Sequence, residues 1–253
     1  MIIACLNGDR STRAHPRLPV TPEQLGADTA DCVLAGATMV HVHPRDESGR
    51  ESLRELDITE ALTAIRHHAP GVRVSVSTRD GIAADFREKL ALIRSWPMPI
   101  DGGPDCASVN WHEPGAVEVA RLLSTKGIGV EAGIWTPRAA IAFVSTNWPW
   151  QVERVLAEAV PGVSPGVSGV WATERILTAL GMSPKPVLVH GEGAWTWPVF
   201  RWGQAAGRQV RIGFEDTLLL PSGREAYDNA ELVRTAGALP DEAASSWPYP
   251  GPY

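Results

Sequence analysis

The sequence predicts a single α/β domain, a closed (β/α)8 barrel. Short apolar segments rich in β-branched residues alternate along the chain with longer amphipathic segments, as in successive strand–helix units. The short segments are apolar on both faces, which is typical of a parallel sheet covered by helices. About eight such units in 253 residues match the size of one (β/α)8 barrel.

The expected elements alternate strictly. Strands are expected at Ile2–Leu6, Met39–His43, Arg73–Ser77, Cys106–Asn110, Gly129–Ala132, Val152–Leu156, Pro186–His190 and Gln209–Phe214. Helices are expected at Pro22–Ala35, Ile58–His68, Ala83–Arg94, Pro114–Ser124, Ala139–Ser145, Ser168–Leu180, Trp195–Ala206 and Arg224–Ala236. The fifth strand is rich in glycine and the sixth adjoins charged residues, so the sequence defines these two least well.

The first helix has a clear start and end in the sequence. Thr21 is a capping residue, Pro22 takes the first helical position, and Gln24 stands three residues after the cap, which is the pattern of a capping box. Gly36 ends this helix ahead of the second strand. Prolines at positions 184 and 186 break the chain before the seventh strand.

Composition excludes several classes of function. The hydrophobic content of 44% and the charged content of 21% are those of a globular protein. A net charge of -6, without a Lys/Arg cluster, argues against nucleic acid as a partner. No apolar run is long enough to span a bilayer, so no membrane partner is expected. Three widely spaced cysteines without a CxxC pair predict reduced thiols and a cytoplasmic location.

The two ends of the chain are expected to differ in structure. Residues 1–240 are expected to form the barrel, beginning directly with a buried strand instead of a signal peptide. Residues 241–253 are expected to form an extended arm, because the proline-rich segment after Trp247 suits neither a helix nor a central strand. This apolar arm and the ten tryptophans predict a homo-oligomer, a dimer or tetramer.

The segment Val40–Asp46 carries the pattern that is most informative about function. Side chains two residues apart on a strand point to the same face, so His41 and His43 project together. Glu215, at the end of the last strand, supplies a third ligand, and two histidines with one glutamate form a common catalytic zinc set. The alternatives are histidines hydrogen-bonded inside the barrel and a Glu215 carboxylate held in a loop ion pair.

A second charged set lies beside Glu215. Arg211 stands two positions before Gly213 on the last strand, so it is expected to point into the barrel, where it requires an anionic partner. Asp216 is the nearest candidate. The pair is either a structural ion pair or a base that the cation keeps ionised.

Barrel active sites lie at the C-terminal ends of the strands, where several other polar residues are expected. Asp9 follows the first strand and also suits a turn, while Ser77 and Ser108 are small residues of low specificity. The segment His190-Gly191-Glu192-Gly193 follows the seventh strand, where barrels commonly bind phosphate at a helix N-terminus. Its glycines suit an anion, but Glu192 would repel one.

Taken together, these motifs resemble the β-keto acid cleavage enzyme family over almost the whole chain. The specific part is His41-Val42-His43-Pro44-Arg45-Asp46 combined with Arg211-Ile212-Gly213-Phe214-Glu215-Asp216. Further matching segments are Asn7-Gly8, Leu18–Glu23, Ala35–Ala37, Ala107–Asn110 and Gly133. The resemblance implies a zinc-dependent (β/α)8 barrel that condenses a β-keto acid with acetyl-CoA and releases acetoacetate and an acyl-CoA.

The resemblance also implies roles for individual residues. His41, His43 and Glu215 are implied as zinc ligands, and another divalent metal is an alternative. Asp216 is implied as the general base, with Arg211 as its partner and Asp9 near the metal.

For the substrate, the resemblance implies that Ser77 and Ser108 hold the carboxylate of the keto acid. The turn Ser77-Thr78-Arg79-Asp80-Gly81 departs from the glycine-rich turn of the family. Arg79 is expected either to clamp the anion or to pair with Asp80.

Two other functions remain as alternatives. An amidohydrolase-like metal hydrolase also uses His-x-His on a barrel strand, but normally on the first strand and with further ligands on the middle strands. A barrel that binds metal without catalysis is the other. The leading interpretation is a metal-dependent acyltransferase with a β-keto acid and acetyl-CoA as substrates.

Overall fold

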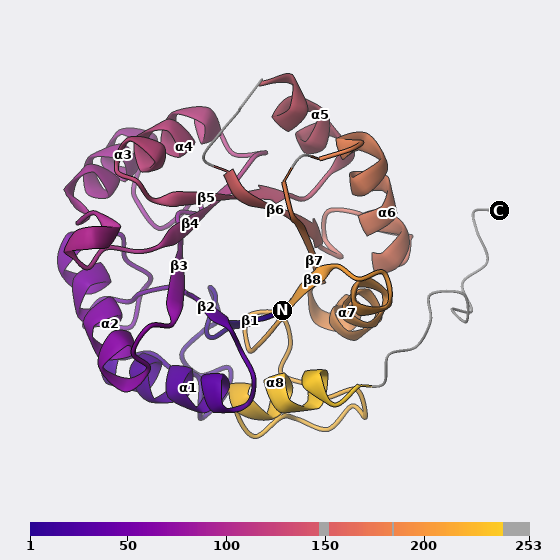
Figure 1. The fold of residues 1–253 in the computed structure, drawn as a ribbon, viewed down its shortest axis with the longest axis horizontal. Coiled ribbons are helices and arrows are strands. Elements are labelled where there is room, and N and C mark those ends of the chain that lie inside the picture. The colour runs from indigo at the N-terminus through magenta and orange to yellow at the C-terminus, as the bar shows by residue number, and fades with distance from the viewer. Residues whose placement is uncertain (147–151, 184, 240–253) are drawn as a thin grey trace.

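A computed structural model describes residues 1–146, 152–183 and 185–239 of the chain. Its strands form a closed parallel barrel in which each strand pairs with the next and β8 pairs with β1. The strands are β1 (Ile2–Cys5), β2 (Met39–Val42), β3 (Arg73–Ser77), β4 (Cys106–Asn110), β5 (Gly129–Ile134), β6 (Val152–Ala159), β7 (Val187–Gly191) and β8 (Gln209–Ile212). Figure 1, viewed along the barrel, shows the strands as an inner ring and the helices around them. The predicted (β/α)8 barrel is confirmed.

The helices follow the strands in the predicted order. They are α1 (Pro22–Leu34), α2 (Glu55–His68), α3 (Phe86–Ser95), α4 (Ala116–Thr125), α5 (Pro137–Ser145), α6 (Gly169–Leu180), α7 (Thr196–Ala205) and α8 (Asn229–Gly237). Short 3-10 turns at Pro99–Asp101 and Gly193–Trp195 precede β4 and α7. The capping box of α1 is confirmed: the Thr21 hydroxyl accepts from the Gln24 amide at 3.2 Å, and the Gln24 side chain accepts from the Thr21 amide at 3.0 Å.

The fifth and sixth strands are longer than predicted. In β5 and β6 the ladder continues through the pair Ile134 and Ala157, and β6 continues along β7 through the pair Glu158 and His190. Glu158, expected beyond the end of its strand, therefore lies within β6. The expected arm at 241–253 falls outside the described residues.

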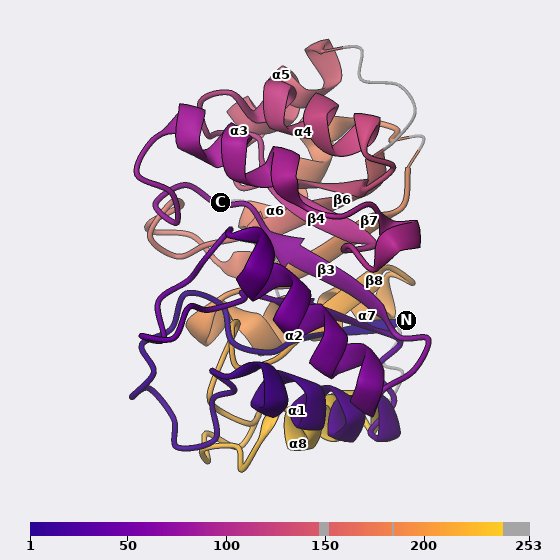
Figure 2. The same ribbon diagram turned by 90° about the vertical axis from the view of Figure 1, so that its left-hand side faces the viewer.

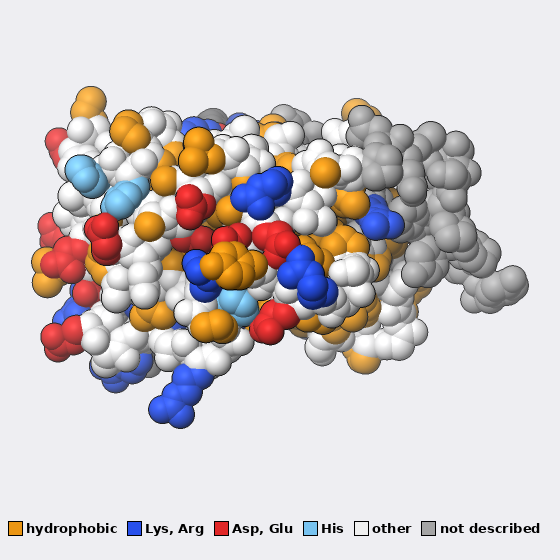
Figure 3. All heavy atoms as spheres, turned by 90° about the horizontal axis from the view of Figure 1, so that it is seen from below, with side chains coloured by type: hydrophobic (Ala, Val, Ile, Leu, Met, Phe, Trp, Pro, Cys, Tyr) orange, Lys and Arg blue, Asp and Glu red, His pale blue; other side chains and the backbone are white. Residues whose placement is uncertain are grey.

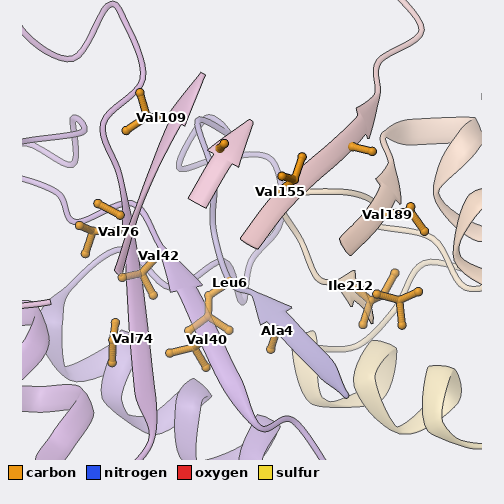
Figure 4. Close-up of a cluster of buried hydrophobic side chains, with 14 of the residues drawn as sticks. Ala4, Leu6, Val40, Val42, Val74, Val76, Val109, Val155, Val189 and Ile212 are labelled. Carbon is orange, nitrogen blue, oxygen red and sulfur yellow. The ribbon is translucent and has the colours of Figure 1, made fainter. Parts of the chain in front are cut away.

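The two faces of each strand contact different surroundings. Figure 4 shows the outward side chains, including Val40, Val42, Val74 and Val76, which belong to the large apolar cluster between barrel and helices. A smaller cluster (Ile3, Cys5, Met39, Cys106, Leu156 and Leu188) comes from the alternate positions of the strands. Because strand side chains alternate, these positions lie inside the barrel together with His41. The lower interior is thus closed by apolar side chains, and polar groups occupy the level above.

The C-terminal ends of the strands face the side where the long loops after β1 and β2 protrude (Figure 2). Arg45, the arginine of the His-x-His-x-Arg-Asp motif, joins these loops. Its guanidinium donates to the carbonyls of Gly8 at 2.9 Å, Arg10 at 2.7 Å and Gly49 at 2.9 Å. No helix among the described residues is long and apolar enough to cross a membrane.

Candidate metal centre and active site

Three side chains form a candidate metal centre at the mouth of the barrel. His41 lies on β2, His43 directly follows it, and Glu215 follows β8. The Nε2 atoms of His41 and His43 each lie 3.8 Å from a carboxylate oxygen of Glu215, and one ligand atom from each residue falls within 4.8 Å of the others. The structure brings the predicted ligands together.

Glycines allow Glu215 to reach the histidines. Gly213 lies so close to β1 that a Cβ atom there would be 2.0 Å from the carbonyl oxygen of Cys5. Gly8 has a φ of +54°, and a Cβ there would meet the Glu215 side chain at 2.5 Å. The Glu215 amide donates to the Cys5 carbonyl at 3.1 Å. The chain after β8 is therefore held against the end of β1, which a larger side chain at either position would prevent.

The Nδ1 atom of each histidine, on the side of the ring away from the candidate metal position, contacts a partner that orients the ring. His43 Nδ1 lies 2.6 Å from Oε1 of Glu51, and His41 Nδ1 lies 3.1 Å from the hydroxyl of Ser75. The Ser75 hydroxyl donates in turn to Glu131, whose carboxylate lies 3.1 Å from Nε of Arg154. Partners of this kind fix the tautomer and the ring plane, so both Nε2 atoms are left to face a metal ion.

The carboxylate partner is expected to matter more than the hydroxyl partner. Replacing Glu51 with alanine removes a charged acceptor from His43 and should weaken metal binding about tenfold to a hundredfold. Ser75→Ala removes a neutral hydroxyl and should weaken metal binding less. Competition with a chelating dye measures both affinities. An equal or larger loss in Ser75→Ala would contradict the role given to Glu51.

The electrostatics of the centre suit a cation. Burial lowers the pKa of His41 to about 3, so its ring is neutral and a lone pair is free. Burial alone would raise the pKa of Glu215, but Arg211, His41 and His43 hold it below its usual range. The Oε2 atom of Glu215 is buried and has no hydrogen-bond partner among the described residues. A neutral histidine and an ionised carboxylate with a free oxygen form a suitable ligand set.

Asp216 lies next to this centre and is fully buried. Its Oδ1 accepts hydrogen bonds from Arg211 at 3.1 Å (Nε) and 2.7 Å (Nη2), while its Oδ2 has no hydrogen-bond partner in the described chain. The Arg211 Nη2 also donates to Glu215 at 2.8 Å. The predicted pairing of Arg211 with Asp216 is therefore confirmed, and Arg211 additionally orients Glu215.

His190 bridges Asp216 to a second buried carboxylate. Its Nδ1 lies 3.3 Å from Asp216 and its Nε2 lies 3.3 Å from Glu158. Burial and Arg211 lower the pKa of His190, but Glu158 and Asp216 outweigh them and raise it to about 9. At neutral pH the imidazole is therefore a cation between two carboxylates.

The charge of His190 predicts a pH dependence of stability. The pKa is about 9 in the folded protein and 6.5 as the ordinary value, so the folded state binds the proton more tightly. The stabilisation is complete below pH 6.5 and is lost as pH rises to 9, a change of about 3 kcal/mol in the free energy of unfolding.

Urea denaturation across this pH range checks the prediction. His190→Gln should lose this part of the pH dependence, whereas His67→Gln, at an exposed site on α2, should keep it. An unchanged slope in His190→Gln would contradict the assigned charge.

All eight strand ends contribute to a cavity of about 210 Å³ in front of the candidate metal centre. Ser77, Ser108 and Arg79, which the sequence led us to expect at the substrate, lie in its wall. Trp135, Glu158 and Glu192 form other parts of the wall, and burial raises the pKa of Glu192 to about 7.

Two of the predicted site residues have contacts that the sequence did not indicate. Arg79 pairs with Glu51, through an Nε–Oε1 distance of 3.0 Å and a second hydrogen bond from Nη2. The carboxylate of Asp80, considered as its partner, is instead bound by Lys89. Asp9 lies at the cavity rim, 65% exposed in its side chain and 3.7 Å from Arg79. Arg79 is thus connected to the candidate metal ligand His43 through the shared Glu51.

The segment from His190 to Gly193 uses two of its backbone amides in contacts within the protein. The amide of Glu192 donates to the Ala159 carbonyl at 3.1 Å, and the amide of Gly193 donates to the Asp216 carbonyl at 2.8 Å. Both amides are therefore engaged, and Glu158 joins Glu192 in the nearby wall. This engagement disfavours an anion site here, as does the repulsion expected from Glu192.

Sequence reasoning missed Glu51 and Ser75. Glu51 lies in a loop where an isolated β-bridge between Arg45 and Glu51 folds the chain back toward His43. No local sequence pattern predicts this fold-back. Ser75 and Ser77 are two residues apart on β3, so the alternation of strand side chains was a usable signal for Ser75.

Comparison with known proteins identifies the family of this chain. A model of the β-keto acid cleavage enzyme family matches residues 1–246. The chain belongs to this family. It is 24% identical over 255 residues to a 3-keto-5-aminohexanoate cleavage enzyme of Acetoanaerobium sticklandii, a match that covers 96% of this chain and 92% of that protein. It is 23% identical over 240 residues to a 3-oxoadipate:acetyl-CoA acetyltransferase of Cupriavidus necator, covering 91% and 84%.

Solved structures show the same architecture. The apo structure of ObcA superposes with a TM-score of 0.65 at 17% identity, covering 87% of this chain and 61% of that chain. A ternary complex of ObcA with a C4-CoA adduct and oxalate gives the same TM-score. The chain described here thus spans less than two thirds of ObcA. At such low sequence identity, the structural similarity supports the barrel fold alone.

Proposed function

We propose that this enzyme is a zinc-dependent acyltransferase that reacts a β-keto acid with acetyl-CoA and releases acetoacetate and an acyl-CoA. Family membership supports the cleavage of a β-keto acid. The names of two relatives describe a 3-keto acid substrate, and one of them includes acetyl-CoA. The observation that carries the proposal is the buried carboxylate of Asp216, with one free oxygen, beside the three-ligand centre.

The residues of the centre fit a zinc ion. His41, His43 and Glu215 offer two imidazole nitrogens and one carboxylate oxygen, which is a set that catalytic zinc commonly takes while keeping a position open. The partnerless Oε2 atom of Glu215 is explained by such an ion. When bound, zinc would act as a Lewis acid toward the keto oxygen and favour loss of the neighbouring proton.

In the first chemical step, Asp216 takes a proton from the carbon between the ketone and the carboxylate of the keto acid. Its free Oδ2 is the acceptor, while Arg211 and the His190 cation hold Oδ1 in a fixed orientation. Ser77, Ser108 and Arg79 are proposed to hold the substrate carboxylate, because all three lie in the same cavity wall.

The remaining steps move the acetyl group. The carbon that lost its proton forms a bond to the acetyl carbonyl carbon, and the CoA thiolate leaves. The thiolate then attacks the ketone carbon of the original keto acid. The bond between this carbon and the newly acetylated carbon breaks. Asp216 returns its proton to the carbon released, which completes acetoacetate, while the rest of the keto acid leaves as its CoA thioester.

A product assay tests the proposed function. Purified enzyme of known metal content is mixed with acetyl-CoA and a panel of β-keto acids that bear acidic, apolar or basic side chains, and products are identified by mass spectrometry. We expect metal-dependent acetoacetate together with the matching acyl-CoA. Consumption of a substrate without acetyl-CoA would instead support the amidohydrolase-like alternative.

A further inference from the structure

A polar groove lies beside the active-site cavity on the same end of the barrel. It has a volume of about 880 Å³ and is bordered by the loop after β1, the loop after β2 and the start of α3. This volume lies in the range of sites for cofactor-sized ligands. Arg45 ties the first two loops together, so the groove has a fixed floor. The groove is therefore a defined concave site at the C-terminal end of the barrel.

The groove adjoins the proposed metal centre. Asp9 lies in the wall of both the groove and the cavity. Glu51 lies in the groove wall and also contacts the ligand His43. A molecule in the groove therefore needs to pass only the rim at Asp9 to reach the cavity.

Two arginines of the groove wall, Arg50 and Arg54, face solvent. Arg50 is 83% exposed, whereas its partner Asp46 is 14% exposed. Arg54 is 55% exposed, whereas its partner Asp57 is 6% exposed. The cations stand toward solvent and their carboxylates lie beneath them. Each pair uses the Nε and Nη2 atoms of its arginine, so the Nη1 group of each guanidinium, which makes no hydrogen bond among the described residues, is available to another anion.

The exposed carboxylates in the groove wall already have partners. Asp9 lies 3.7 Å from Arg79, and Glu88 accepts a hydrogen bond from the Ala84 amide at 2.5 Å. A second surface pocket, on the side of α1 and α8, contains Asp28, Asp31 and Asp228 and so suits an anion poorly. Figure 3 shows acidic and basic side chains interspersed on that side.

We propose that this groove binds the phosphate-bearing nucleotide end of the acyl-thioester substrate, with Arg50 and Arg54 contacting its phosphates. The guanidinium fork matches phosphate oxygens and binds them with charge-assisted hydrogen bonds. The flexible arm of the thioester then passes Asp9 and brings the acetyl group to the cavity. This assignment rests on the proposed use of acetyl-CoA, and it adds the site that selects the nucleotide.

The test compares two thioesters in the double variant Arg50→Ala/Arg54→Ala. Acetyl-CoA carries the nucleotide, whereas acetyl-pantetheine ends before it. The KM for acetyl-CoA should rise about tenfold for each arginine removed, so the advantage of acetyl-CoA over acetyl-pantetheine should collapse. High salt should raise the KM for acetyl-CoA in the native enzyme, and this rise should be smaller in the variant.

Arg73→Ala is the matched control, because Arg73 is a half-exposed arginine paired with Glu153 at the opposite end of the barrel. It should leave the KM for acetyl-CoA unaltered. Arg50→Glu, a single charge reversal, should raise the KM for acetyl-CoA more than Arg50→Ala. This single variant takes the place of the double variant if the double variant does not fold. An unaltered KM for acetyl-CoA in these groove variants would overturn the proposal and leave the reaction intact.

Calorimetric titration with CoA itself separates the groove from the reaction. Weaker CoA binding by the double variant would support the groove even in the absence of turnover. Equal CoA binding by the native enzyme and the variant would overturn the groove assignment. Failure of the native enzyme to bind CoA would overturn both the groove and the proposed reaction.

Discussion

Replacing Asp216 with asparagine is expected to leave the metal bound and to lower turnover about a thousandfold or more. Asparagine preserves the shape of the side chain, but its amide cannot take a proton from carbon. Glu215, His41 and His43 are untouched, so the metal ligands remain in place. Steady-state rates and metal analysis on the same sample measure both outcomes.

The control for this substitution is another aspartate that pairs with an arginine. Asp105 lies 3.5 Å from Arg66 at the N-terminal end of the barrel, ahead of β4. Asp105→Asn should keep near-native turnover. If Asp216→Asn turned over at the native rate, Asp216 would not be the base.

Glu215→Gln is expected to lower metal affinity at least about a hundredfold. This loss is about ten times larger than the one expected for Ser75→Ala, which removes only a residue that orients a ligand. A neutral amide is a poorer ligand for a divalent cation than a carboxylate. The substitution also removes one of the two anions that balance Arg211, so that cation then faces the metal position with less compensation. Metal content after dialysis, measured by mass spectrometry, checks this.

Glu225→Gln is the matched control, since Glu225 is an exposed glutamate in the same loop region and its carboxylate lies 3.9 Å from His15. It should retain full metal content. Stoichiometric metal in dialysed Glu215→Gln would rule out Glu215 as a ligand.

Local patterns in the sequence were sufficient to predict the architecture and two of the three candidate metal ligands. The capping residues of α1 and the alternation of apolar segments depend on neighbours in the chain, so they can be read directly. His41 and His43 were also local, because strand alternation alone places them on one face. Arg211 and Asp216 were found for the same reason, being close together at the end of β8.

The contacts that orient the site depend on distant parts of the chain. Glu51 reaches His43 only because the loop after β2 folds back, and it then captures Arg79 from the end of β3. His190 comes between Glu158 and Asp216 because β6, β7 and β8 are neighbours in the barrel. Such pairings depend on register and loop path, which residue spacing within one segment does not encode.

The most direct test of the central claim is the fate of a labelled acetyl group. Acetyl-CoA labelled with ¹³C in both acetyl carbons is incubated with enzyme and an accepted β-keto acid, and products are separated by mass. The proposed reaction predicts that both labelled carbons appear in acetoacetate and none in the new acyl-CoA. Label in the acyl-CoA or in free acetate, or keto acid consumed without acetyl-CoA, would contradict the proposed carbon–carbon bond chemistry.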